Sequence, residues 1–287
     1  AHPRCRAAAT RPTLAQERRI EERRAMDFSQ FVTSGAPAIA EGAIVERIRR
    51  DRHLTLDPHI LNGGLIYEPA GRARLAEIHG AYMRSARVAG LPILMFTDTW
   101  RCSQSLVQAS RFRGRSVNRD NARFLGDLRA DSPSGPPVFI GGLIGPSGDA
   151  YKPADSLTRA AARTFHRQQI EALASSGVDY LFLATAPAVD EALGIADVMA
   201  GTGLPYILSF VIRRTGVVLD GTPLGQAMLR IDAQAAKPPI GYSVNCVHAR
   251  VLAAALETVA ATDPGILRRL LMFQANTGDK EVEDLDG

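Results

Sequence analysis

The sequence contains no run of about 18 consecutive apolar residues, so we expect no membrane-spanning helix. Its longest apolar runs, such as LPILMF and LPYILSFVI, have the length of buried strands. The N-terminal region lacks the apolar segment of a secretory signal. The cysteines, Cys5, Cys102 and Cys246, are too few and too widely spaced for a disulfide framework. We therefore expect a reducing, cytoplasmic location.

Several common catalytic motifs are also missing. There is no GxGxxG after the first expected strand and no GxxxxGK[ST], which are the usual signatures of dinucleotide and phosphate-loop sites. There is no GxSxG nucleophile turn and no HExxH zinc motif. No lysine ends an expected strand, which argues against a lyase or aldolase that forms a Schiff base.

The net charge of +4 is concentrated at one end of the chain. Residues 1–26 contain seven Arg and three Glu, a net charge of +4, so the remainder is close to neutral. A protein that binds nucleic acid usually carries its basic residues on a folded face. Here the basic residues lie in an N-terminal extension, so we expect no nucleic-acid partner. We interpret residues 1–40 as a flexible, Arg-rich extension and residues 41–287 as one folded domain.

From residue 59 onward, short apolar runs alternate with longer Ala-rich segments of helical periodicity. This alternation predicts an α/β fold with a parallel sheet covered by helices. Seven strands fit two folds, a doubly wound sheet and a (β/α)8 barrel that lacks one strand. In either fold the active site lies at the carboxyl ends of the strands. The expected strands span residues 59–66, 92–99, 137–144, 179–185, 205–212, 240–246 and 270–276.

Polar residues and glycines collect at the expected strand ends, which predicts a binding face there. The segment GGLIGPSGD (141–149) could hold an anion or simply form a tight loop. Cys246 ends its strand and is followed by His248; it could be a small core residue or a metal or thiol site. His248 could reach the same site.

Five ordered segments resemble the homocysteine S-methyltransferase family. These are ILNGGLIYE (60–68), GGLIGPSGDAY (141–151), FHRQQIEALASSGVDYLFLATAPAVDEA (165–192), SFVIRRTGVVLDGTPL (209–224) and VNC (244–246). The resemblance covers about residues 59–287. It implies a (β/α)8 TIM barrel, and we expect the eighth strand and its flanking helices to be missing from these 287 residues.

The resemblance also implies an enzyme of methionine biosynthesis that holds a catalytic Zn²⁺. Cys246 matches one of three thiolate ligands, and the other two are expected as a cysteine pair beyond Gly287. The zinc-bound acceptor thiol would attack a methyl group on a sulfonium or ammonium donor. Both partners are small molecules. The residues expected to line their pocket are Asn62, Glu68, Asp98, Thr185 and Asn245.

The sequence departs from the family pattern in three places. The paired cysteines are absent from the 287 residues, Ala184 stands where the family usually has a Glu that binds the homocysteine amino group, and Asn62 replaces an Asp on the first strand. These departures leave a second hypothesis: a divergent barrel that binds another small molecule without zinc and transfers no methyl group. A barrel with two unpaired edges is also expected to be marginally stable or to form a homo-oligomer.

Overall fold

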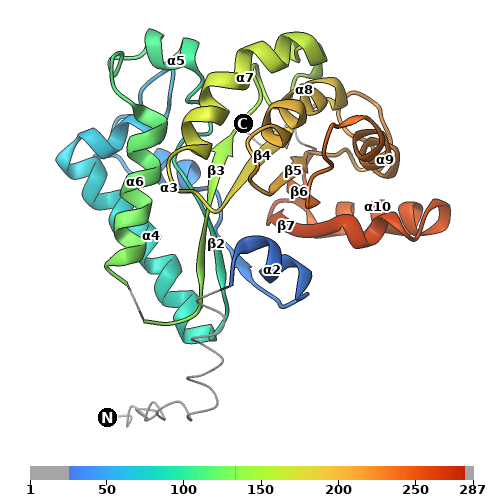
Figure 1. Ribbon diagram of the computed structural model, residues 1–287, viewed down its shortest axis with the longest axis horizontal. Helices are drawn as coiled ribbons and strands as arrows, with labels where there is room; N and C mark the ends of the chain where they lie inside the picture. Colours follow the sequence, from blue (N-terminus) through green and yellow to red (C-terminus); the bar gives the residue numbers. More distant parts are fainter. Residues whose placement is uncertain (1–25, 133, 282–287) are drawn as a thin grey trace.

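The computed structural model describes residues 26–132 and 134–281. Seven parallel strands form one sheet in the order in which they occur in the chain, and the sheet curls into a nearly closed TIM-like barrel (Figure 1). The strands are β1 (Ile39–Ala40), β2 (Ile93–Phe96), β3 (Val138–Ile144), β4 (Tyr180–Ala186), β5 (Tyr206–Phe210), β6 (Gly241–His248) and β7 (Leu270–Asn276). The barrel implied by the family resemblance is therefore confirmed, and of the two folds that the alternation left open the doubly wound sheet is excluded.

Helices follow most of the strands and cover the outside of the sheet. In Figure 1, α4 and α6 lie beside β2 and β3, whereas α9 and α10 lie beside the last strands of the chain. The principal helices are α4 (Pro69–Ala89), α5 (Gln104–Ala109), α6 (Val117–Ala130), α7 (Arg159–Ala174), α8 (Val189–Ala200), α9 (Leu224–Gln234) and α10 (Ala249–Thr262). Shorter elements are α2 (Phe28–Thr33), α3 (Ile44–Arg49), η1 (Asn62–Tyr67), η2 (Pro153–Asp155) and η3 (Ile266–Arg269).

The prediction of a first strand at residues 59–66 is wrong. Residues 62–67 form the 3-10 helix η1, and the first strand of the barrel is the two-residue β1, which pairs with β2. The apolar pattern wrongly predicted a strand here. Gly63 and Gly64 instead allow η1 to pack closely against Cys102 and Phe112: a Cβ on Gly63 would lie 2.4 Å from the Sγ of Cys102. Asn62 consequently does not end the first strand, and Glu41 takes that place.

A boundary between a flexible extension and the folded domain was expected at residue 40, and this position lies inside the packed structure. Helix α2 buries Phe28 and Phe31, and the ring of Phe28 stacks on Tyr180 at a centroid distance of 4.1 Å. Because Tyr180 begins β4, α2 covers the amino-terminal end of the barrel. The Arg-rich residues 1–25 lie outside the described residues.

Strands β1 and β7 are the two edges of the sheet. Within residues 26–132 and 134–281, no strand pairs with the outer side of either edge. This arrangement is consistent with the expected absence of an eighth strand. The predicted marginal stability and self-association stay predictions.

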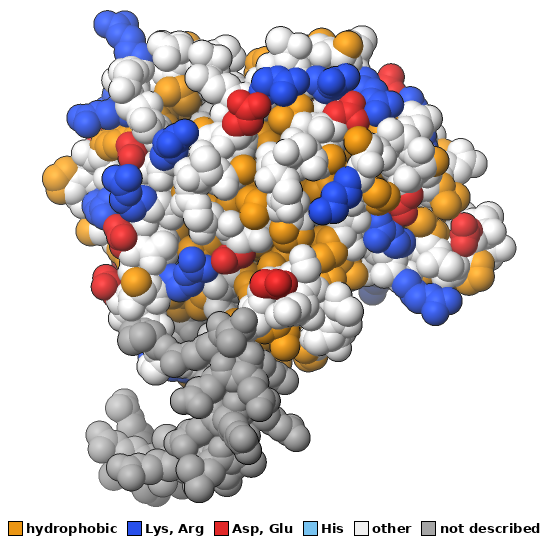
Figure 2. All heavy atoms as spheres, viewed as in Figure 1, with side chains coloured by type: hydrophobic (Ala, Val, Ile, Leu, Met, Phe, Trp, Pro, Cys, Tyr) orange, Lys and Arg blue, Asp and Glu red, His pale blue; other side chains and the backbone are white. Residues whose placement is uncertain are grey.

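The surface carries mixed charge. Figure 2 shows Lys and Arg side chains among Asp and Glu side chains across one face, over a background of scattered apolar groups. Among the helices that the structure describes, none is both long enough and apolar enough to span a membrane.

Candidate functional site at the carboxyl ends of the strands

Four polar residues form a buried network where β1 and β2 end. His79, on α4, contacts two carboxylates: its Nδ1 lies 3.2 Å from Oε2 of Glu41 and its Nε2 lies 3.0 Å from Oδ2 of Asp98. Asn62 donates from Nδ2 to Oδ1 of Asp98 at 2.5 Å. The backbone N–H of Phe96 donates to Oε1 of Glu41 at 2.7 Å. The network therefore joins η1 and α4 to the first two strands.

The buried charges of this network determine its protonation. Burial alone would lower the pKa of His79, but the neighbouring carboxylates of Asp98 and Glu41 raise it to about 10. Burial also raises the pKa of Glu41, against the opposing effect of His79. At neutral pH His79 is therefore an imidazolium that links two acidic groups.

A second polar cluster lies where β4, β5 and β6 end. Oδ1 of Asn245 accepts hydrogen bonds from the Thr185 N–H at 3.0 Å and from the Ser209 hydroxyl at 2.6 Å. Nδ2 of Asn245 donates to Oγ1 of Thr185 at 2.9 Å and to Sγ of Cys246 at 3.1 Å. One amide thus connects the ends of three neighbouring strands.

Cys246 lies at the margin of this cluster. It is half-buried, and burial raises the pKa of its thiol, whereas hydrogen bonds from Asn245, Tyr151 and Thr185 act to lower that pKa. The backbone carbonyl of Cys246 accepts a hydrogen bond from Nδ2 of Asn276 at 3.1 Å. The sulfur therefore lies among polar donors, unlike that of an ordinary core cysteine.

The Gly-rich segment 141–149 holds a carboxylate of the chain itself. Oε1 of Glu191, on α8, accepts from the Ser147 N–H at 2.7 Å, and its Oε2 accepts from the Leu157 N–H at 3.2 Å. Nε2 of His166 lies 3.0 Å from the same carboxylate. Burial acts to raise the pKa of Glu191, but the bonds from His166 and Ser147 lower it below its ordinary value. One N–H of the segment, that of Ser147, is therefore already occupied by a carboxylate of the chain.

The structure separates Glu68 and His248 from these clusters but places Cys102 beside the first, with its Sγ 3.9 Å from the backbone oxygen of Asp98. Glu68 forms an ion pair with Arg111 and is partly exposed. Cys102 is fully buried, with a pKa raised by desolvation. His248 caps α10, where its Nδ1 accepts from the Arg250 N–H at 3.2 Å.

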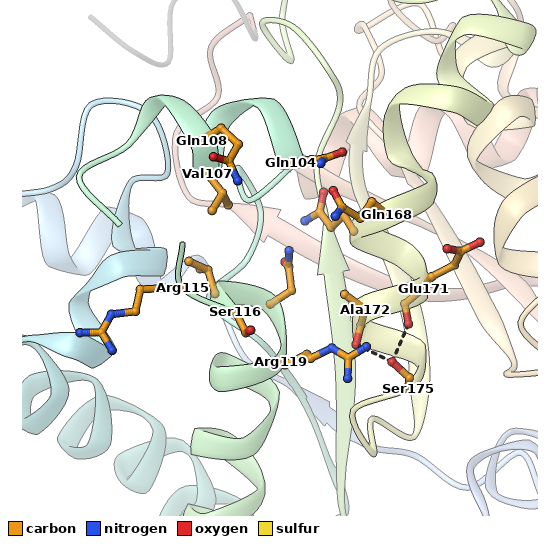
Figure 3. Close-up of a pocket in the computed structure, with 13 residues that line it drawn as sticks. Gln104, Val107, Gln108, Arg115, Ser116, Arg119, Gln168, Glu171, Ala172 and Ser175 are labelled. Atoms are coloured by element: carbon orange, nitrogen blue, oxygen red, sulfur yellow. Dashed lines mark hydrogen bonds between the residues drawn. The ribbon is translucent and has the colours of Figure 1, made fainter. Parts of the chain in front are cut away.

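A groove of about 480 Å³ lies on the outer side of the barrel, between α5, α6 and α7. Figure 3 shows Gln104 facing Gln168 at one end of this groove and Arg119 extending toward Ser175 at the other. None of the residues predicted for the site lines the groove. We therefore place the candidate site at the strand ends and not in this groove.

The donor set around Cys246 does not fit a zinc ion on its own. A catalytic zinc usually has three protein ligands. In residues 26–132 and 134–281, no three His, Cys, Asp or Glu side chains form a group that could hold a metal. The thiolate pair expected beyond Gly287 stays a prediction.

The sequence alone did not identify four residues that organise these clusters. Glu41, His79, Ser209 and Glu191 are all almost fully buried. His79 and Glu191 lie within helices, where a polar residue gives no indication of its partner in a distant segment. The helical pattern around His79 and His166 favoured a structural or exposed position for both, and Ser209 was noted only as part of a strand end.

Comparisons with known proteins agree with this architecture. The sequence model of the family described as homocysteine S-methyltransferase matches residues 38–286. Crystal structures of the Escherichia coli homocysteine methyltransferase MmuM are similar to this chain. The metallated form has a TM-score of 0.68 at 19% identity and covers 89% of this chain and 96% of that chain. The apo form has a TM-score of 0.61 at 19% identity and covers 86% and 92%. A comparison with curated protein sequences finds no match.

Proposed function

The chain belongs to the homocysteine S-methyltransferase family, and from this premise we propose that it transfers a methyl group from a sulfonium or ammonium donor to a thiol such as homocysteine. The observation that carries this proposal is the family match over residues 38–286, which includes both polar clusters at the strand ends. The position of the clusters supports it, because TIM-barrel enzymes carry their chemistry at this face.

The reaction needs a deprotonated acceptor. A bond forms between the acceptor sulfur and the methyl carbon, the bond from that carbon to the donor sulfur or nitrogen breaks, and the thiol proton leaves to solvent. An alkyl thiol is mostly protonated at neutral pH, and zinc coordination would remove this proton. We propose Cys246 as the one ligand that the described residues would contribute. The described residues do not complete a zinc site by themselves.

Substrate binding is proposed for the two clusters in different ways. Asn62 and Asp98 are proposed to contact one substrate at the ends of β1 and β2, where both side chains are held in place by the network around His79. In the second cluster, the side-chain amide of Asn245 links Thr185 to Cys246, because its Nδ2 donates to Oγ1 of Thr185 and to Sγ of Cys246. Thr185 is therefore proposed to contact a substrate near the sulfur. Glu68 is the weakest of the proposed substrate contacts because it is paired with Arg111.

A second candidate function is a metal-free barrel that binds a different small molecule. It is favoured by the lack of a metal-binding group of side chains in the described part of the chain. Ala184, a buried apolar residue near the end of β4, also provides no carboxylate for an amino group.

Methyl transfer can be tested with homocysteine as acceptor and either S-methylmethionine or glycine betaine as donor, with methionine measured by mass spectrometry. Zinc content is measured on the same samples by elemental analysis. In a protein that carries the cysteine pair predicted beyond Gly287, we expect methionine formation that is lost in Cys246→Ser and retained in Cys102→Ser. If neither donor gives methionine, and zinc is absent from wild type and Cys246→Ser alike, the metal-free binding function is favoured instead.

A further inference from the structure

Asn245 has no hydrogen-bonding capacity left for a ligand. A side-chain amide has two N–H donors and two acceptor positions on its oxygen. In this chain both donors and both acceptor positions are engaged, by Thr185, Ser209 and Cys246. Asn245 is also almost fully buried, with 5% of its surface exposed. A substrate contact would therefore require one of these four bonds to break.

Two partners of Asn245 have an unusual backbone conformation. Thr185 has a φ of 61° and Cys246 a φ of 59°, which is the left-handed region that residues with a Cβ rarely adopt. Each lies at an irregularity of the sheet, one between Leu183 and Ala186 and the other between Asn245 and Val247. A β-branched threonine in this region is an outlier that persists only where its surroundings hold it.

The bonds from Asn245 reach both of these residues. Its Oδ1 accepts the backbone N–H of Thr185, and its Nδ2 binds the side-chain oxygen of Thr185 and the sulfur of Cys246. The amide thus fixes the peptide direction at one strand end and the thiol direction at another. The hydroxyl of Ser209, from the strand between them, fixes the amide itself.

We propose that Asn245 is a positioning residue, which holds Thr185 and Cys246 in their left-handed conformations and so directs the Cys246 sulfur at the carboxyl end of the barrel. This role replaces the substrate contact expected for Asn245 from the sequence. The geometric part stands on the contacts above, and its consequence for catalysis rests on the proposed function.

The geometric part is tested by crystal structures of Asn245→Ala and of a matched control, Asn121→Ala. Asn121 is equally buried and donates two hydrogen bonds, to the carbonyls of Gly63 and Val117, in a different part of the barrel. Each variant is expected to lower Tm by roughly 5 °C, because each removes a buried hydrogen-bonded amide. Only Asn245→Ala should return Thr185 and Cys246 to negative φ.

Retention of positive φ at either residue in Asn245→Ala would overturn the proposal. If that variant does not fold, Asn245→Ser replaces it, since a serine hydroxyl fills part of the space but is too short to reach both neighbours. The same criterion then applies to the serine variant. This result does not depend on whether the chain transfers methyl groups.

The catalytic consequence is tested by steady-state kinetics with homocysteine and the better of the two donors. Displacement of a group that positions the reactants lowers the rate of the chemical step by about tenfold to a hundredfold. We expect Asn245→Ala to lower kcat by at least about tenfold with KM changed by less than about twofold, and Asn121→Ala to leave both constants unchanged per folded molecule. A raised KM with an unchanged kcat would instead make Asn245 a substrate contact. Absence of turnover in wild type would refute the proposed function and leave the crystallographic result to decide the geometry.

Discussion

Gln274, on β7, donates a hydrogen bond from its Nε2 to the backbone carbonyl of Glu41, directly after β1, at 2.7 Å. The two residues are 233 positions apart in the sequence and lie at the two edges of the sheet. The same Glu41 contacts His79 with its side chain. A single side chain on the last strand is thereby connected to the buried network at the first.

Replacing Gln274 by Ala should therefore weaken the connection between the two edges. We expect the free energy of unfolding to fall by about 1–2 kcal/mol, because the carbonyl of Glu41 loses its partner in a half-buried position. Urea denaturation measures this change. Gln226→Ala, on the exposed side of α9, serves as the control and should change stability by less than about 0.5 kcal/mol. Equal effects of the two variants would contradict the structural role of Gln274.

The raised pKa of His79 predicts a pH-dependent stability. In the folded chain this pKa is about 10, compared with 6.5 for an unperturbed histidine. The folded state therefore binds the proton more tightly than the unfolded state between these values. The stabilisation is complete below pH 6.5 and is lost as the pH rises toward 10.

Unfolding free energies measured from pH 6 to 10 should show this decline in wild type and a smaller one in His79→Gln. His53→Gln provides the control, because His53 is exposed in a loop and should leave the wild-type slope intact. A wild-type slope in His79→Gln would show that other groups cause the decline.

Removing the charge of Glu191 should loosen the third βα loop. In Glu191→Gln one oxygen can still accept from the loop, but the charge-assisted bond to His166 is lost. We expect a loss of about 1–3 kcal/mol in the free energy of unfolding and faster hydrogen exchange at the amides of Ser147 and Leu157. The neighbouring Asp190→Asn removes only an exposed pair with Arg230 and should cost less than about 1 kcal/mol. Unchanged exchange at both amides would refute this role of Glu191.

Phe28 should contribute strongly to stability if α2 belongs to the barrel. Its ring is 98% buried, as the exposed fraction is 2%, and it packs on Phe139 and Tyr180. Replacement by Ala should lower the free energy of unfolding by about 3–5 kcal/mol. Val88→Ala, at a position that is 90% exposed, is the control and should have almost no effect. A small effect of Phe28→Ala in chemical denaturation would place α2 outside the cooperative structure.

The sequence allowed most of the barrel to be predicted because six of its strands are apolar runs between helices. The expected strand at 179–185, for example, differs by one residue at each end from β4, and all residues of β4 are buried. β1 gave no such signal because it has only two residues, Ile39 and Ala40. The run at 59–66 gave a false signal, because its apolar residues are buried outside the sheet. Ile60 packs against the second βα loop, whereas Leu65 and Ile66 pack against α3, α4 and α6.

The site was predictable only in part. Asp98, Thr185, Asn245 and Cys246 were expected from their places at strand ends, and the structure brings the last three into contact. The role of Asn245 depends on positive φ values at Thr185 and Cys246, which neither residue type favours. The partners of His79 lie 38 and 19 positions away on different elements, so no local pattern relates them.

The carboxylate of Glu191 has a consequence for binding entropy. A Gly-rich loop that waits for a ligand must lose conformational freedom when the ligand arrives, and this loss weakens affinity. The loop after β3 instead donates the N–H groups of Ser147 and Leu157 to a carboxylate that the chain itself carries on α8. The conformational entropy of this loop is therefore lost when the chain folds. A ligand that binds on this side of the barrel would meet a loop that is already ordered, and its affinity would not be lowered by that entropy loss.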